Sequence, residues 1–147
     1  MIVVDANIIA YLFIKGERTE QARQLYAQDP DWTTPPLWQH EFLNVLATVV
    51  KQGNRTVADA LNLWHQAEAL MLNQERAITL SEALILATTH GISAYDAQYL
   101  TLADRLNCVL ITEDKRLVQK FPDSAMTMQV FLGSLGTHGV DRVASSE

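Results

Sequence analysis

Short apolar segments alternate with longer amphipathic segments along most of the chain, and this alternation limits the folds that are open to it. The apolar segments have the length of strands, and they lie at 3–5, 32–34, 77–80, 108–112 and 127–130. The segments between them have the patterns of helices, and they lie at 6–13, 19–28, 37–51, 56–73, 81–90, 93–106 and 113–120. Short apolar strands joined through helices form parallel sheets that helices cover on both faces. The sequence therefore predicts an α/β fold, a three-layer α/β/α sandwich with a mainly parallel central sheet of four to five strands.

The length of the chain is that of a single domain. Folding a chain of 147 residues buries about two-thirds of the surface that the unfolded chain exposes. No repeat, linker or low-complexity block interrupts the alternation of strands and helices. We expect one domain over 1–132 and a loose tail over 133–147, where the chain becomes rich in Gly, Ser and Thr.

The composition indicates a soluble cytoplasmic protein. Hydrophobic residues make up 48% of the chain and charged residues 19%, which is typical of globular domains. No apolar stretch reaches the roughly 18 residues of a membrane span, and the N-terminus lacks the basic region and cleavage site of a signal peptide. Cys108 is the single cysteine, so no intrachain disulfide can form.

The net charge constrains how this chain can handle nucleic acid. Seventeen acidic and eleven basic residues give a formal charge of −6. This balance argues against a broad basic surface that grips nucleic acid through its phosphates. It leaves open a phosphate-handling enzyme whose positive charge is supplied by a metal ion.

Acidic residues directly follow two of the predicted strands. Asp5 ends the first strand, and Glu113 and Asp114 follow the strand that ends at Thr112. In open parallel sheets, binding sites lie beyond the carboxyl ends of the strands. Structural interpretations also exist, because Asp5 can cap a helix and two acids suit the first turn of another. Thr112 can likewise cap a helix or hold a ligand water.

Two further acids lie on helices that can flank those strand ends. Glu41 lies on the shoulder of helix 37–51, between its apolar stripe and solvent, where it can be solvated or reach into a cleft. Asp96 shares a helix flank with apolar and aromatic residues, but it also matches a capping box with Ser93. His40 is the histidine nearest to these acids, and the helix pattern places it away from the apolar stripe.

Taken together, the four acids suggest a metal site. Two carboxylates about 4 Å apart repel each other by about 4 kcal/mol at an effective dielectric constant of roughly 20. Several such pairs require either protonation or a bound cation. An all-oxygen ligand set suits Mg²⁺ or Mn²⁺, which retain waters and accept phosphate oxygens. The candidate ligands are Asp5, Glu41, Asp96 and one member of the pair Glu113 and Asp114.

Four segments resemble the acidic motifs of PIN-domain ribonucleases, and they occur in the same order. They read VVDANIIAYLF, HEFLNVL, SAYDAQYLTLA and VLITEDKRL. The resemblance is to bacterial VapC-type toxins of type II toxin–antitoxin systems, and it extends over residues 1 to about 131. The long helix pair from Leu37 to about Asn73 departs from compact toxins, so the resemblance fixes neither the partner nor the target.

The resemblance implies an endoribonuclease in which the four acids hold one or two Mg²⁺ or Mn²⁺ ions. Asn7 and Thr112 match supporting polar positions, and motif matching is what selects Asp114 over Glu113. The resemblance also implies a small antitoxin partner and a homodimer. Basic residues that follow the first and last motifs can hold RNA phosphates or simply be solvated, and they are Lys15, Arg18, Lys115 and Arg116.

Alternatives from other classes make specific demands on the sequence. A haloacid-dehalogenase-like phosphatase needs a second Asp where this chain has Asn7, and a receiver domain has no counterpart of Glu41. A catalytically silent PIN-like interaction module, which binds a protein or RNA, remains open. Leu43 and Val50 are compatible with it, because they lie on the helix face away from the main apolar stripe and suit a partner or dimer surface as well as a second core layer.

Overall fold

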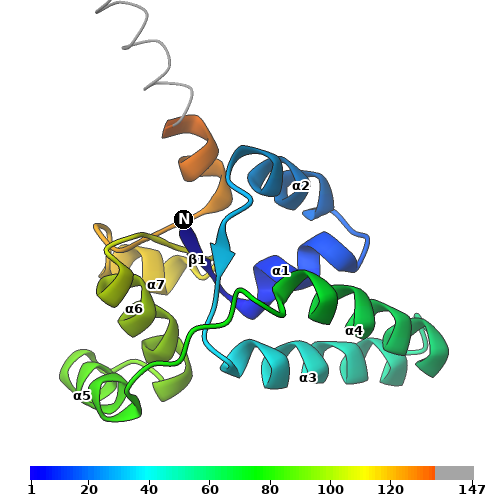
Figure 1. Cartoon of the computed structure of the whole chain (residues 1–147), viewed down its shortest axis with the longest axis horizontal. Coiled ribbons are helices and arrows are strands. Elements are labelled where there is room, and N and C mark those ends of the chain that lie inside the picture. The colour runs from blue at the N-terminus through cyan, green and yellow to red at the C-terminus, as the bar shows by residue number, and fades with distance from the viewer. Residues whose placement is uncertain (135–147) are drawn as a thin grey trace, which may run out of the picture.

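The computed structural model describes residues 1–134, with a parallel β-sheet at the centre (Figure 1). The strands of the sheet are β1 (Ile2–Val4), β2 (Trp32–Thr33), β3 (Leu110–Ile111) and β4 (Ala125–Met126). They are arranged in the order β2-β1-β3-β4, and all neighbouring pairs are parallel. The predicted sheet is therefore confirmed, with four strands among the described residues.

Helices connect the strands and follow most of the predicted segments. They are α1 (Ala6–Phe13), α2 (Thr19–Gln28), α3 (Leu37–Lys51), α4 (Val57–Met71), α5 (Leu80–His90), α6 (Ala94–Leu106) and α7 (Lys115–Lys120). Residues 128–134 form a further helical segment. Thr56 and Asp59 form a reciprocal capping box at the start of α4, and Gly91 ends α5 in the left-handed conformation with a φ of 66°.

Side chains of the central strands alternate between two hydrophobic cores, as a sheet covered on both faces requires. Ile2 and Val4 of β1 pack into the core that α1, α2, α3 and α4 share. Val3 lies between them and packs with Leu110 into the core that α6 and α7 share. α5 packs against α6 through a cluster of alanines. These two helical layers and the sheet confirm the predicted α/β/α sandwich.

The strand predicted at 77–80 is wrong. The chain is irregular before α5 begins at Leu80. This part of the chain reaches the sheet through an isolated parallel bridge between Thr34 and Glu75. The apolar signal has a different cause, because Ile78 packs against the core residues of α5 and α6 instead of pairing in the sheet.

The strand predicted at 127–130 is also wrong. β4 ends at Met126, and the helical segment begins at Met128. Met128 is fully buried, and its backbone N–H donates to Glu113 Oε1 over 3.0 Å. A short apolar run does not by itself distinguish a strand from the start of a buried helix.

The tail predicted at 133–147 falls almost entirely outside the described residues. Gly133 and Ser134 are the last described residues, and they belong to the helical segment. The domain boundary at residue 132 therefore stays a prediction. Within residues 1–134, the structure contains no helix with the length and apolar character needed to cross a membrane.

Candidate active site

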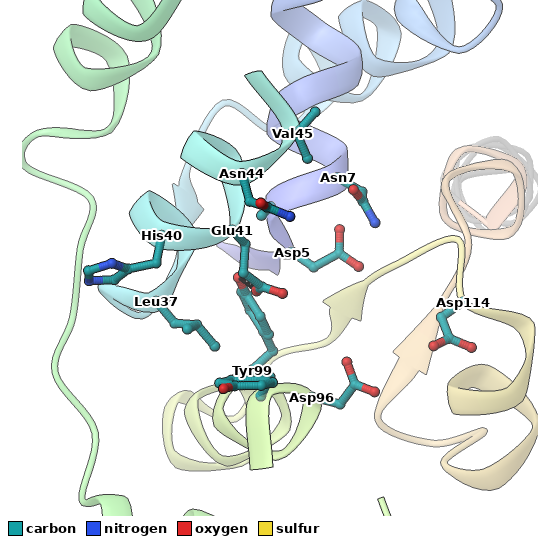
Figure 2. A pocket seen from close by; sticks show the side chains of 12 residues that line it. Asp5, Asn7, Leu37, His40, Glu41, Asn44, Val45, Asp96, Tyr99 and Asp114 are labelled. Carbon is teal, nitrogen blue, oxygen red and sulfur yellow. Dashed lines mark hydrogen bonds between the residues drawn. The ribbon is translucent and has the colours of Figure 1, made fainter. Parts of the chain in front are cut away.

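A cleft of about 460 Å³ opens where the central strands end at the carboxyl edge of the sheet (Figure 2). Its acidic lining comes from the N-terminal ends of four helices, α1, α3, α6 and α7. It consists of Asp5, Glu41, Asp96 and Asp114, here called the cleft acids. Figure 2 shows their carboxylates directed towards one central space. The fold thus gathers all four predicted ligands, from both ends of the sequence, around one cleft.

Asp5 combines a structural role with an unfavourable electrostatic position. It is the N-cap of α1, and its Oδ1 accepts a hydrogen bond from the Ile8 N–H over 3.1 Å. The pKa of the Asp5 carboxyl is raised to about 6, mainly by burial and to a smaller extent by the charge of Glu41. Hydrogen bonds from the Thr112 hydroxyl and the Ile8 N–H oppose this rise. The helix cap therefore exists, and it does not remove the cost of ionising Asp5.

Thr112 connects the acids that follow β1 and β3. The residue is 1% exposed, its hydroxyl donates to Asp5, and its Oγ1 accepts from the Asp114 N–H over 3.2 Å. Asp114, rather than Thr112, caps α7, because Asp114 Oδ1 accepts from the N–H groups of Arg116 and Leu117 over 3.0 and 3.3 Å. Thr112 therefore positions both Asp5 and Asp114.

The two adjacent acids after β3 have different surroundings. Asp114 lines the cleft. Glu113 Oε2 forms an ion pair with Arg18 Nη1 at 2.8 Å, and its Oε1 accepts from the Met128 N–H. Glu113 is thus occupied in joining the start of α2 to the last helical segment, and Asp114 is the member of the pair that borders the cleft.

Glu41 and Asp96 approach the cleft from facing helices. Burial raises the pKa of Glu41, the Tyr99 hydroxyl opposes this rise, and the charge of Asp96 adds to it. Burial also raises the pKa of Asp96, with a further increase from Asp114 and an opposing hydrogen bond from Ser93. Of the two bonds in the predicted capping box, the one from the Asp96 N–H to Ser93 Oγ forms over 3.0 Å. The Asp96 carboxylate is directed into the cleft instead of completing the box (Figure 2).

Each cleft acid repels the next one around the cleft. The pKa of Asp5 is raised by Glu41, that of Glu41 by Asp96, and that of Asp96 by Asp114. None of the four forms an ion pair within residues 1–134, and this part of the chain has no three carboxylate, imidazole or thiol groups close enough to hold one ion jointly. Mg²⁺ is usually bound through one or two carboxylates with waters in its other positions. A set of carboxylates that form no ion pair in these residues fits such a hydrated Mg²⁺ or Mn²⁺ ion.

Asn44 and Tyr99 line the cleft although the sequence patterns did not identify them as site residues. Asn44 lies three positions after Glu41 on α3, and Tyr99 lies three positions after Asp96 on α6. Side chains three apart on a helix are neighbours on its surface. This spacing is the signal that could have found both residues.

Asn7 and His40 also border the cleft. Asn7 is exposed at the second position of α1. The ring of His40 points away from the cleft acids in Figure 2. In this conformation its imidazole is not directed at a group held among the acids.

The basic residues predicted to contact RNA lie outside the lining of the acidic cleft. Lys15 and Arg18 line a neighbouring cleft of about 350 Å³, which shares Asn7 with the acidic one. Lys15 is exposed, whereas the charge of Arg18 is balanced by its ion pair with Glu113. The other two residues, exposed in the first turn of α7, are Lys115 and Arg116.

Comparisons with known proteins agree with the motifs and the fold. The family model of the PIN domain matches residues 2–121. Ribonuclease VapC3 of Pyrobaculum aerophilum is 35% identical over 125 residues, which are 82% of this chain and 95% of that protein. The crystal structure of PAE2754 from Pyrobaculum aerophilum has a TM-score of 0.70 at 22% identity, and it covers 92% of this chain and 96% of that one.

A second solved structure is a toxin–antitoxin complex from Klebsiella pneumoniae. Its matching chain has a TM-score of 0.58 at 19% identity, over 87% of this chain and 98% of that one. At these identities the two structures show that the fold is shared, while the family model and VapC3 confirm the resemblance found in the sequence. The chain therefore belongs to the PIN-domain family, and within that family it is similar to the VapC ribonucleases.

Proposed function

We propose that this chain is a divalent-metal-dependent endoribonuclease that hydrolyses RNA phosphodiester bonds and is the toxin of a toxin–antitoxin pair. The observation that carries the proposal is the convergence of four carboxylates on one cleft, none of which forms an ion pair within residues 1–134. The similarity to VapC3, a ribonuclease by name, supports the same reaction. The nuclease domain in this proposal spans residues 1–132, and an RNA substrate implies that the enzyme acts in the cytoplasm.

The cleft acids are the proposed ligands of one or two Mg²⁺ or Mn²⁺ ions. When bound, such an ion supplies a Lewis acid that activates a water and neutralises the charge developing on the phosphodiester. The task of the protein is to keep its carboxylates ionised and oriented. Thr112 contributes by donating to Asp5 and by accepting from the Asp114 N–H. Asn7 places an exposed amide at the same cleft, where it can donate to a phosphate oxygen.

The flanking RNA backbone is proposed to contact exposed basic residues on either side of the cleft. Lys15 lies in the adjoining cleft, and Lys115 and Arg116 lie in the first turn of α7. Such contacts position the strand and add a salt-dependent contribution to binding. Arg18 contributes less, because Glu113 already balances its charge.

We further propose that the toxin pairs with a small antitoxin and forms a homodimer. The Klebsiella pneumoniae structure with this fold is a toxin–antitoxin complex. On this chain, Leu43 and Val50 line an apolar groove of about 520 Å³ between α3 and α4, and Leu43 and Leu61 there are each 54% exposed. Exposed apolar patches of this kind mark protein interfaces. Replacing Leu43 and Leu61 together by Glu should lower the mass of the assembly in light scattering.

The experiment that tests the catalytic proposal is cleavage of single-stranded RNA by the purified chain. Cleavage is expected with Mg²⁺ or Mn²⁺, and it should stop when EDTA is added and return when the metal is restored. Asp96→Asn should remove the activity, whereas Asp104→Asn is a matched control on an exposed part of the same helix. Cleavage that continues in EDTA contradicts the metal mechanism. A chain that binds no Mn²⁺ in calorimetry would instead be the catalytically silent interaction module.

A further inference from the structure

Tyr99 joins the elements that carry the cleft acids without being an acid itself. Its residue is 2% exposed and belongs to the core between the sheet and α6. Its hydroxyl reaches the cleft and donates to Glu41 Oε1 over 2.5 Å. The backbone N–H of Ala6, the residue after Asp5, interacts with the same hydroxyl oxygen. One hydroxyl group thus links α1, α3 and α6 at the place where their acids meet.

The hydrogen-bond acceptor of its hydroxyl distinguishes Tyr99 from an ordinary buried tyrosine. A buried hydroxyl requires a hydrogen-bond partner, and a backbone carbonyl would satisfy it. The partner here is one oxygen of a cleft carboxylate, and hydrogen bonds to carboxylates are short and about twice as strong as neutral ones. The ring is fixed by the core, so the bond restrains the longer and more flexible Glu41 side chain and not the reverse.

We propose that Tyr99 is a positioning residue that orients Glu41 for metal binding. The hydroxyl occupies Oε1, so Oε2 is the oxygen that would be available to hold a metal ion in the cleft. This inference rests on the proposed function, because it assigns a role to Glu41 as a ligand. Ligating carboxylates are generally oriented by such hydrogen bonds, and losing one typically lowers metal affinity or activity about 10–100-fold.

The test compares Tyr99→Phe with Tyr95→Phe, since both remove a single hydroxyl from α6 at the same cleft. Tyr95 is 61% exposed, and it supplies the matched control. Tyr99→Phe keeps the buried ring, and it should weaken Mn²⁺ binding in calorimetry about 10–100-fold. RNA cleavage should recover when the Mn²⁺ concentration is raised, with an unchanged KM for RNA. Tyr95→Phe should bind Mn²⁺ like the parent chain.

The same substitution in a chain that already carries Glu41→Ala shows whether Tyr99 acts through Glu41. In a Glu41→Ala chain the hydroxyl has no carboxylate to orient, so adding Tyr99→Phe should cause no further loss of Mn²⁺ affinity. A further loss there, including one caused by unfolding, overturns the inference, and so does parent-like Mn²⁺ affinity in the Tyr99→Phe single variant. A parent chain that neither binds Mn²⁺ nor cleaves RNA overturns the proposed function itself, which distinguishes the two failures.

Discussion

Two groups of acids lie near the carboxyl edge of the sheet, and the fold surrounds them differently. Glu113, after β3, is paired with Arg18 and accepts from a backbone N–H. Glu75, next to the end of β2, accepts from the side chains of Trp38, over 2.6 Å, and Gln39. The cleft acids receive hydroxyl or backbone donors but form no ion pair within the described residues, and each lies within the electrostatic influence of another.

The difference teaches that position and residue type do not identify a metal site by themselves. Glu113 and Asp114 are adjacent acids at the end of the same strand, yet the first is compensated within the protein and the second borders the cleft. A carboxylate with its own cation is already balanced and gains little from a metal ion. Uncompensated acids that share one cleft are the ones whose repulsion a divalent ion relieves.

The largest expected effect is on catalysis. Asp5→Asn and Asp96→Asn should each reduce RNA cleavage by about 10²–10³-fold or more, the size of effect seen when one electrostatic stabiliser is removed from an active site. Glu113→Gln changes the same chemical group at the compensated position and should keep most of the activity. Initial rates on a fluorescent single-stranded RNA measure this. Equal losses in Glu113→Gln and Asp96→Asn would contradict the division into two groups.

How much of this arrangement the sequence predicts depends on the range of the interactions. The alternating pattern predicts β1, the long helices and the parallel sheet, because burial of strand faces and helix stripes is encoded locally. The wrong strands at 77–80 and 127–130 are short apolar runs, in which the apolar residues Ile78 and Met128 pack in the cores without pairing in the sheet. Such runs carry too few residues to reveal a period.

The site residues also divide into those that a local pattern predicts and those that depend on partners far apart in the sequence. Asp5 could be predicted as a strand-end acid, and the motifs selected Asp114. The ion pair that occupies Glu113 joins residues that lie 95 positions apart in the sequence, so no local pattern reveals it. The bond between Tyr99 and Glu41 spans 58 positions, so no local pattern reveals it either. Partners of this kind become visible only when the chain is folded.

The next largest expected effect is on the free energy of unfolding. It should rise when a cleft acid is neutralised and fall when Glu113 is neutralised. In metal-free protein at pH 7, Asp5→Asn should raise the free energy of unfolding by about 1–2 kcal/mol, below the ceiling of roughly 3 kcal/mol that its raised pKa allows. Glu113→Gln should lower it by about 0.5–1 kcal/mol, because a partly exposed ion pair is lost. Urea unfolding measures both values. A loss of stability in Asp5→Asn would show that its capping bonds outweigh its charge.

The pH dependence of the metal-free chain should sharpen the comparison further. Burial raises the pKa of Asp5 from 3.8 to about 6, so the folded state binds its proton more tightly than the unfolded state does. The stabilising effect of that proton is complete below about pH 4 and is lost as the pH rises through about 6. The Asp5 carboxyl alone should therefore raise the free energy of unfolding by about 1 kcal/mol when the pH is lowered from 7 to 5. Asp5→Asn should lack this increase in urea titrations at the two pH values, and an equal increase in both proteins would contradict the assignment.

The smallest effect concerns the basic residues beside the cleft and tests whether uncompensated cations, like uncompensated acids, mark function. Lys115 and Arg116 are exposed and form no ion pair in residues 1–134, whereas Arg18 is paired with Glu113. Each phosphate contact with a single strand contributes about 0.7 to the slope of log affinity against log salt concentration. Replacing Lys115 and Arg116 by Ala should therefore reduce that slope by about 1.4, while Arg18→Ala changes it by less. An unchanged slope in the double variant would mean that α7 does not contact the RNA.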